Sequence, residues 1–206
     1  MDFDSKAQAW DNDPIKIERA RKFAERIMDS LPENQGLIAL EFGSGTGQVS
    51  LFLHKHFRHI YLIDSSPGMI DVLKNNIRQR NIQNMEPLFK DLMKEPPEIK
   101  DLDVIYTLMT LHHIEDLNHI LNVFSSTLKP GGLLFIGDLE KEDGSFHDHA
   151  HDFRGHHGFE KDKLKKLLEK NGFSETDYRK FFKLTKKLEN GNLKEFPLFF
   201  MAARRD

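Results

Sequence analysis

The residues whose spacing most clearly predicts chemistry are three glycines at alternate positions: Gly43, Gly45 and Gly47. Apolar segments flank them at residues 37–42, 49–53 and 60–63, and the last segment ends at Asp64. This order predicts a strand, a tight turn, a helix beginning at Gly47 and a second strand that ends in a carboxylate. Glycine reaches positive φ at little cost and lets a ligand lie against the main chain. Because N–H groups at a helix start and a carboxylate at a strand end suit a phosphate or a ribose, the pattern predicts a nucleoside site.

The identity of the nucleoside depends on two departures from the dinucleotide pattern. That pattern places its third glycine one position later, where this chain has Gln48. Glu41 precedes the first glycine by two positions, and its charge would repel a pyrophosphate but attract a cation. Both departures disfavour an NAD(P)-dependent reductase. The alternative to any nucleoside site is a tight turn that binds no ligand.

The segment E-F-G-S-G-T-G resembles the first motif of the class I S-adenosylmethionine-dependent methyltransferases, whose cofactor carries an ammonium and a sulfonium. A second set, D-V-I-Y, L-H-H and L-K-P-G-G-L-L-F-I, looks like the same class, so the resemblance covers Leu37 to Asp138. It implies S-adenosylmethionine as the cofactor. The residues it implies for cofactor binding are Glu41, Gly43, Ser44, Gly45, Gly47, Asp64, Ser65, Met69, Asp91, Leu92 and Leu108. In this class Glu41 would lie near the positive end of the cofactor, Asp64 would hold the ribose and Asp91 the adenine amine.

The histidines supply the candidate proton acceptors, since the unperturbed pKa of histidine lies near neutral pH. His112 and His113 follow the predicted strand 104–108 at the sheet edge where ligands bind in open α/β folds. Five more lie in the polar segment 140–160: His147, His149, His151, His156 and His157. We predict His113, His156 and His157 as candidate catalytic groups, and His112 and His147 as residues at the acceptor side.

The run H-D-H-A-H-D could present imidazoles and carboxylates to a divalent metal. A helical metal site would require spacings of three or four residues, which only His147 and His151 supply. We therefore expect a solvated loop with one or two histidines at the substrate mouth, and no metal.

Composition limits the possible classes of protein. The 206 residues suit one domain, and 30 basic against 33 acidic residues give a net charge of −3, which argues against a nucleic-acid partner. The absence of cysteine excludes disulfides, thiolate metal sites and cysteine nucleophiles. It also disfavours arsenic as the methyl acceptor, since the arsenic-methylating members of the resembled class work through cysteines. The N-terminus is acidic and no apolar run approaches about 18 residues, so a cytoplasmic protein without a membrane partner is expected, as a monomer or homodimer.

Three parts are expected within one domain: an N-terminal lid and helix (1–35), a cofactor-binding core (36–139), and a substrate-side loop, helix and strand pair (140–206). Trp10, the sole tryptophan, is either a packing anchor or, by the resemblance, part of a lid over the cofactor. Helices are predicted at 15–31, from Pro67, at 116–128 and at 160–171, and the later strands at 88–91, 104–108, 133–138, 176–184 and 196–203. The resemblance implies an α/β, Rossmann-like three-layer sandwich with a seven-stranded mixed sheet of order 3-2-1-4-5-7-6 and an antiparallel last strand.

The function expected from these features is methyl transfer from S-adenosylmethionine to a small molecule by in-line displacement. Such a reaction mainly requires alignment of the acceptor and removal of its proton. No Asn-Pro-Pro-Tyr motif is present, which argues against methylation of exocyclic base amines. The alternative is a cofactor-binding, methyltransferase-like module that acts as a protein partner without its own turnover.

Overall fold

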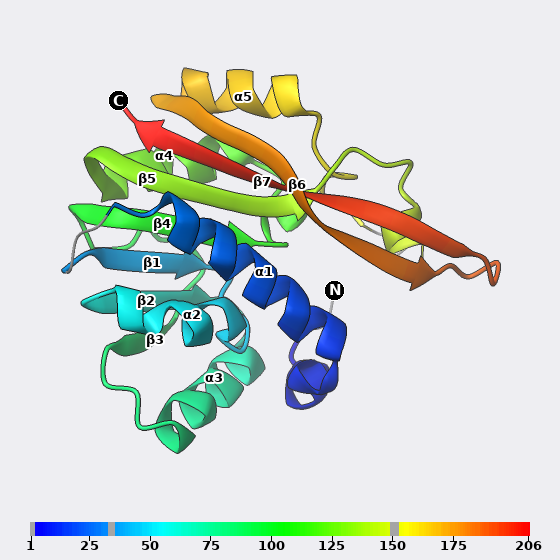
Figure 1. Ribbon diagram of the computed structural model, residues 1–206, viewed down its shortest axis with the longest axis horizontal. Helices are drawn as coiled ribbons and strands as arrows, with labels where there is room; N and C mark the ends of the chain where they lie inside the picture. Colours follow the sequence, from blue (N-terminus) through cyan, green and yellow to red (C-terminus); the bar gives the residue numbers. More distant parts are fainter. Residues whose placement is uncertain (1–2, 33–35, 149–152) are drawn as a thin grey trace.

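Seven strands form one sheet in the order β3-β2-β1-β4-β5-β7-β6 (Figure 1). The structure is a computed structural model, and it describes residues 3–32, 36–148 and 153–206. The strands are β1 (Ile38–Phe42), β2 (His59–Asp64), β3 (Met85–Phe89), β4 (Leu102–Leu108), β5 (Leu128–Leu139), β6 (Phe173–Lys187) and β7 (Leu193–Arg205). Strands β1 to β5 pair in parallel, and β7 runs antiparallel to both β5 and β6. The predicted strand order and the antiparallel last strand are confirmed.

Helices cover both faces of the sheet and complete the three layers. On one face lie α1 (Pro14–Ser30), α2 (Gln48–Leu53) and α3 (Pro67–Gln79), whose apolar sides share a buried cluster with β1 and β2. On the other face lie α4 (Leu117–Thr127) and α5 (Lys161–Lys170), which pack in a second cluster with β4 and β5. Since both faces are covered, the central strands are apolar on both sides, as parallel strands usually are.

Local sequence signals determine where three of the helices begin. The Asp13 side chain accepts a hydrogen bond from the Ile15 amide at the start of α1, and Pro14 is the first helical residue. Ser66 caps α3 in the same way through the Met69 amide, and Asp116 caps α4 through the His119 amide. Each of these helices therefore begins directly after its capping residue.

Several strand boundaries differ from those predicted. Strand β5 begins at Leu128 because Leu128 pairs with Leu102 before an irregularity in the register, so the K-P-G-G segment belongs to the strand. Strand β3 lies at Met85–Phe89, slightly before the predicted 88–91. The β6–β7 hairpin is longer than expected at both ends, because its antiparallel pairing continues from Phe173 with Arg205 to Lys187 with Leu193.

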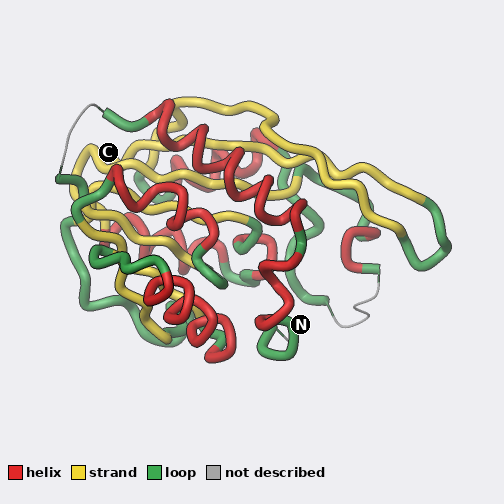
Figure 2. The backbone as a smooth tube through the Cα atoms, turned by 60° about the horizontal axis from the view of Figure 1, so that its bottom comes forward, coloured by secondary structure: helices red, strands yellow, loops and turns green. Residues whose placement is uncertain are grey.

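The carboxyl ends of β1, β2 and β4 meet at one edge of the sheet, since these strands are parallel neighbours. The N-terminal segment lies beside this edge, and the β6–β7 hairpin extends past it (Figures 1 and 2). Along the described parts of the chain, we find no helix with the length and apolar character needed to cross a bilayer.

Candidate functional site

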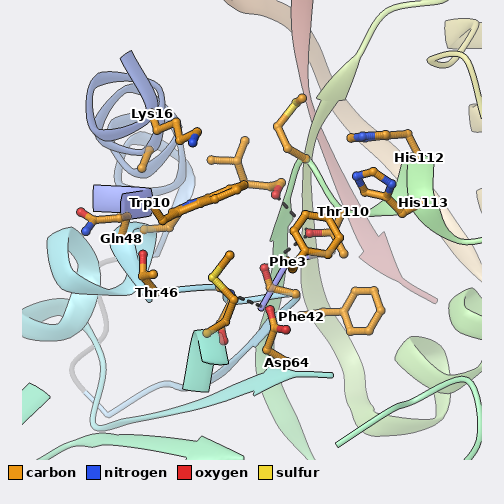
Figure 3. A pocket seen from close by; sticks show the side chains of 18 of the residues that line it. Phe3, Trp10, Lys16, Phe42, Thr46, Gln48, Asp64, Thr110, His112 and His113 are labelled. Atoms are coloured by element: carbon orange, nitrogen blue, oxygen red, sulfur yellow. Dashed lines mark hydrogen bonds between the residues drawn. The ribbon is translucent and has the colours of Figure 1, made fainter. Parts of the chain in front are cut away.

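A cavity of about 660 Å³ opens at the carboxyl ends of the parallel strands. Its walls come from the N-terminal segment, α1, the glycine loop after β1, the loops after β2, β3 and β4, the segment 146–147 and strand β6. Figure 3 places Trp10 and Lys16 on one side and His112 and His113 on the other, with Phe3 and Thr110 between them. The cavity therefore joins the predicted cofactor site to the predicted acceptor side.

The glycine loop has the backbone conformation that its sequence predicts. Gly43, Gly45 and Gly47 have φ values of 67°, 52° and 81°, a region that other residues rarely adopt. A Cβ on Gly43 would lie 2.3 Å from Cγ2 of Thr110, in the loop after β4. Glycine at position 43 is thus required both by the turn and by the close approach of a second loop.

Asp64, at the end of β2, holds the glycine loop as well as lining the cavity. Its Oδ2 accepts a 2.7 Å hydrogen bond from the Gly45 amide, and its Oδ1 accepts a 2.8 Å hydrogen bond from the Ser66 amide. Burial raises the pKa of this carboxyl above its ordinary value. The predicted ribose carboxylate therefore lies at the cavity wall, oriented by two main-chain donors.

Glu41 is a buried carboxyl that lines the cavity from β1. The Ser50 hydroxyl donates a hydrogen bond to it, and Ser50 Oγ lies 2.5 Å from the Tyr106 hydroxyl. Burial raises the pKa of Glu41 to about 8. Glu41 is therefore mostly protonated at neutral pH, and a cation nearby would favour its ionised form.

Arg19, on α1, is a cavity residue that the sequence analysis missed. Its guanidinium is largely buried, its Nε has no hydrogen-bond partner among the described residues, and burial lowers its pKa to about 10. Arg19 lies next to Ala20 and four residues before Phe23, both of which are buried, so it falls on the inward stripe of the helix. An arginine within an otherwise apolar stripe was the available signal, because a buried cation is costly without an anionic partner.

Most of the other predicted cofactor residues also line the cavity: Ser44, Ser65, Met69, Asp91, Leu92 and Leu108. Gly47 does not; it begins α2 and packs against Leu73. Asp91 accepts a 3.0 Å hydrogen bond from the Met93 amide and forms a 3.0 Å ion pair with Lys94. Apart from Gly47, which caps α2, the predicted residues therefore all line one cavity.

Two aspartates attach the N-terminal segment to the cofactor loops. Asp4 accepts hydrogen bonds from the Ser66 hydroxyl (2.5 Å) and the Gly68 amide (2.9 Å). Asp11 accepts hydrogen bonds from the Thr46 hydroxyl (2.6 Å) and the Asn76 side-chain amide (2.9 Å). Phe3 and Trp10, between and beside these contacts, line the cavity, and the Lys16 ammonium lies 3.8 Å from the centre of a Trp10 ring.

The acceptor side contains a buried histidine–carboxylate pair. His112 Nδ1 lies 2.6 Å from Asp138 Oδ1, and the His112 amide donates a 3.2 Å hydrogen bond to Asp138 Oδ2. Both side chains are almost fully buried. Asp138 is the last-but-one residue of β5, so the pair joins the ends of two neighbouring strands.

His113 and His147 complete a group of three imidazoles with His112. The ring centre of His147 lies 5.2 Å from that of His112 and 5.3 Å from that of His113. Burial, followed by the neighbouring His112 and His147, lowers the pKa of His113 to about 3. A group with so low a pKa is a weak proton acceptor at neutral pH, so its predicted role as a base gains no support from this environment.

His156 and His157, the other candidate catalytic residues, do not line the cavity. The His156 amide donates a 2.7 Å hydrogen bond to the His112 carbonyl, and its ring packs near Phe159. His157 Nδ1 lies 3.6 Å from a carboxylate oxygen of Glu142. His149 and His151 lie outside the described residues.

The arrangement of strands, glycine loop and carboxylates defines a class I methyltransferase fold. A family model described as a methyltransferase domain matches residues 15–177, so the chain belongs to this methyltransferase family. S-adenosylmethionine is therefore the cofactor expected for it.

This chain matches different shares of the length of its curated relatives, and less than half of two of them. An uncharacterized methyltransferase of Schizosaccharomyces pombe is 33% identical over 128 residues, which are 58% of this chain and 44% of the relative. A second one, from Geobacillus kaustophilus, is 27% identical over 165 residues, 73% of this chain and 75% of the relative. The ubiquinone biosynthesis O-methyltransferase of Coxiella burnetii is 29% identical over 113 residues, 52% of this chain and 45% of the relative.

Solved structures share the fold at low sequence identity. A methyltransferase from Aquifex aeolicus described as dependent on S-adenosylmethionine superposes with a TM-score of 0.72 at 20% identity, and each chain is covered completely. The cyclase SpnF superposes with a TM-score of 0.71 at 15% identity, covering 90% of this chain and 80% of its own. Because a protein named as a cyclase shares this fold, the reaction must be argued from the site.

Proposed function

We propose that this protein transfers a methyl group from S-adenosylmethionine to a small-molecule hydroxyl. The observation that carries the proposal is the single cavity, which joins the glycine loop and Asp64 to the three imidazoles of His112, His113 and His147. Two curated relatives support an oxygen acceptor, since one is named as an O-methyltransferase of ubiquinone biosynthesis and another as the 27-O-demethylrifamycin SV methyltransferase.

The residues of the cavity fit the cofactor. Burial makes a charge on Glu41 costly, and the ammonium and sulfonium of the cofactor would compensate that charge. Arg19 carries an unpartnered Nε that suits the cofactor carboxylate. Asp64 would accept hydrogen bonds from the ribose hydroxyls and Asp91 from the adenine amine, as the family resemblance implies.

The cofactor supplies a methyl group activated by sulfonium, so the chain must mainly align the acceptor and exclude water. The N-terminal segment covers one side of the cavity through Phe3 and Trp10. Phe146 and Leu184 provide apolar walls on the acceptor side, beside the imidazoles. The acceptor's hydroxyl would lie beside this histidine group, where Asp138 fixes the orientation of His112.

Two measurements test this function. Calorimetry should show binding of S-adenosylmethionine and S-adenosylhomocysteine but not of NAD. Incubation with S-adenosylmethionine labelled in its methyl group and a mixture of hydroxylated metabolites should then give labelled products that alkali does not hydrolyse, as expected of ethers. Cofactor binding without transfer to any acceptor would favour the alternative of a non-catalytic partner module, and tight NAD binding would contradict both.

A further inference from the structure

Three histidine side chains from two distant segments meet at the inner end of the cavity. His112 and His113 end the 3₁₀ helix Leu111–His113 after β4, and His147 ends the 3₁₀ helix Ser145–His147 after β5. One ring nitrogen from each of the three lies within 4.8 Å of the other two. All three side chains line the cavity (Figure 3 shows His112 and His113).

The position of Asp138 distinguishes this group from a chance gathering of histidines. Its carboxylate binds Nδ1 of His112 at 2.6 Å and leaves Nε2 of the same ring available. A histidine that binds a metal through one nitrogen commonly donates its other N–H to a carboxylate, which fixes the tautomer and the ring orientation. His112 is 1% exposed and Asp138 is fully buried, so this orientation is held firmly.

Aromatic rings hold the other two imidazoles in place. Phe153 stacks on His147 with ring centres 3.9 Å apart and an interplanar angle of 9°, and Phe3 meets the edge of His113 at 5.4 Å. Phe146 contacts the ring of His147 at 5.0 Å. Together these contacts restrict the orientations that the two imidazoles can adopt.

We propose that His112, His113 and His147 bind one divalent transition-metal ion of the Zn²⁺ type. Imidazole nitrogen suits Zn²⁺, Co²⁺, Ni²⁺ and Cu²⁺, whereas Mg²⁺ and Ca²⁺ prefer oxygen ligands that this group does not offer. Tetrahedral coordination at about 2.1 Å would place the three nitrogens roughly 3.4 Å apart, so nitrogens that now lie within 4.8 Å of one another would approach by at most about 1.4 Å. Three protein ligands leave a fourth position, which a molecule in the cavity could fill because all three histidines line that cavity.

The acceptor could bind the ion at its fourth coordination position, a role that rests on the proposed function. A hydroxyl of the acceptor that binds the ion becomes more acidic and loses its proton to solvent. The oxygen then attacks the methyl carbon as the bond between that carbon and the sulfonium sulfur breaks, and the electron pair remains on sulfur. The acceptor class is thus a small molecule with a metal-binding hydroxyl, and no histidine has to act as the base.

Metal binding is tested without cofactor or acceptor, so the result is independent of the proposed function. The full chain, prepared without a histidine tag and freed of metal with a chelator, is titrated with Zn²⁺ by calorimetry and with Co²⁺ by visible absorption. One ion per chain and the spectrum of a four-coordinate Co²⁺ site are expected. His113→Gln and His147→Gln should each weaken binding more than tenfold, and Asp138→Asn by about 10- to 100-fold.

Two controls separate this site from other histidines. His56→Gln changes an exposed histidine outside the cavity and should bind the metal as the unchanged protein does. The double variant His149→Gln/His151→Gln changes the histidines outside the described residues and should also bind normally. Circular dichroism confirms that each variant is folded, and His112→Gln is left out because that side chain is fully packed.

Three results would overturn the proposal. The first is no stoichiometric binding of either ion, which would make the three imidazoles a packing cluster. The second is unchanged binding in both folded single variants, His113→Gln and His147→Gln. The third is loss of binding only in the His149/His151 double variant, which would place the metal elsewhere in the histidine-rich segment.

Discussion

The carboxylate of Asp11 accepts a 2.6 Å hydrogen bond from the hydroxyl of Thr46, which lies in the glycine loop. The same carboxylate accepts a 2.9 Å hydrogen bond from Asn76 on α3. One side chain of the N-terminal segment therefore contacts both the loop that forms the floor of the cavity and the helix behind it. Cofactor binding and the position of the N-terminal segment should be linked through this residue.

Replacing Asp11 should weaken that link. Asp11→Ala removes the acceptor of two hydrogen bonds, each worth roughly 1.5–3 kcal/mol at most because the acceptor is charged. We expect the affinity for S-adenosylmethionine to fall about tenfold, and quenching of Trp10 fluorescence by iodide to increase. Asp29→Ala, which changes an exposed acid at the carboxyl end of α1, is the control. Unchanged affinity and quenching in Asp11→Ala would show that the contact does not hold the segment.

Asp64→Asn should separate cofactor binding from stability. The amide can still accept from the Ser66 amide, but it loses the charge and one of the two contacts described above. We expect cofactor affinity to fall tenfold or more, since a hydrogen bond to a charged group is worth about 1.5–3 kcal/mol. The free energy of unfolding should change little, because the burial that raises the pKa of Asp64 no longer opposes a charge. Asp71→Asn, at an exposed position on α3, provides the comparison.

Arg19→Met tests the carboxylate-binding role of the buried arginine. Methionine fills a similar volume without a charge, so the free energy of unfolding should stay constant or rise. Cofactor affinity should fall at least about tenfold, since a charge-assisted contact to the carboxylate is lost. Arg26→Met, on an exposed face of α1, should alter neither quantity. An Arg19→Met protein that binds the cofactor normally would place the carboxylate elsewhere.

The raised pKa of Glu41 should make the free energy of unfolding depend on pH above pH 6.5. The pKa of Glu41 is raised to about 8 in the folded protein, while an unfolded glutamate titrates near its ordinary value. Between pH 6.5 and 8 the folded state therefore binds more protons, and the free energy of unfolding falls as pH rises, by at most about 1.4 kcal/mol per unit. His113, with its pKa lowered to about 3, acts in the opposite sense but below about pH 6.5. Chemical denaturation at several pH values should show this slope, and Glu41→Gln should remove it.

Cofactor binding should also release a proton from the Glu41 carboxyl. A bound cation favours ionised Glu41, so affinity for S-adenosylmethionine should rise with pH between about 6.5 and 8. Calorimetry in buffers of different ionisation enthalpy measures the protons released. Glu41→Gln should bind with no pH dependence in this interval. Equal proton release in the variant and the unchanged protein would assign the titration to another group.

Local patterns predicted the individual helices and strands, and the resemblance to a methyltransferase class implied the order in which the strands pair. The glycines at 43, 45 and 47 predicted the turn that their positive φ values form, and the apolar segments predicted which strands are buried. Strand ends were less predictable, since β5 and the β6–β7 hairpin are extended by pairing with neighbours rather than by their own apolar residues. Asp64 and Glu41 could be placed near the cavity because each lies at a fixed distance from the glycines.

The acceptor side could not be predicted in the same way. His147 contacts His112 because β4 and β5 are neighbours and the chain returns toward β4 after β5. The spacing of the two histidines in the sequence does not indicate this contact. The sequence spacing suggested His147 with His151 instead. Asp4 and Asp11 were missed for a related reason: their partners, Ser66 and Thr46, lie in other loops, and an aspartate in a polar segment gives no sign of such a partner.

The two edge strands of the sheet have consequences for self-association. An unpaired edge can recruit a strand from another molecule, and short strands, proline and lysine oppose this. Strand β3 has five residues and contains Pro87, which lacks an N–H group. Strand β6 carries exposed cations along its length: Arg179, Lys180, Lys183 and Lys187. Both edges therefore resist continuation of the sheet, so a homodimer of this chain would have to form through its helices or loops, and concentrated solutions should resist strand-mediated aggregation.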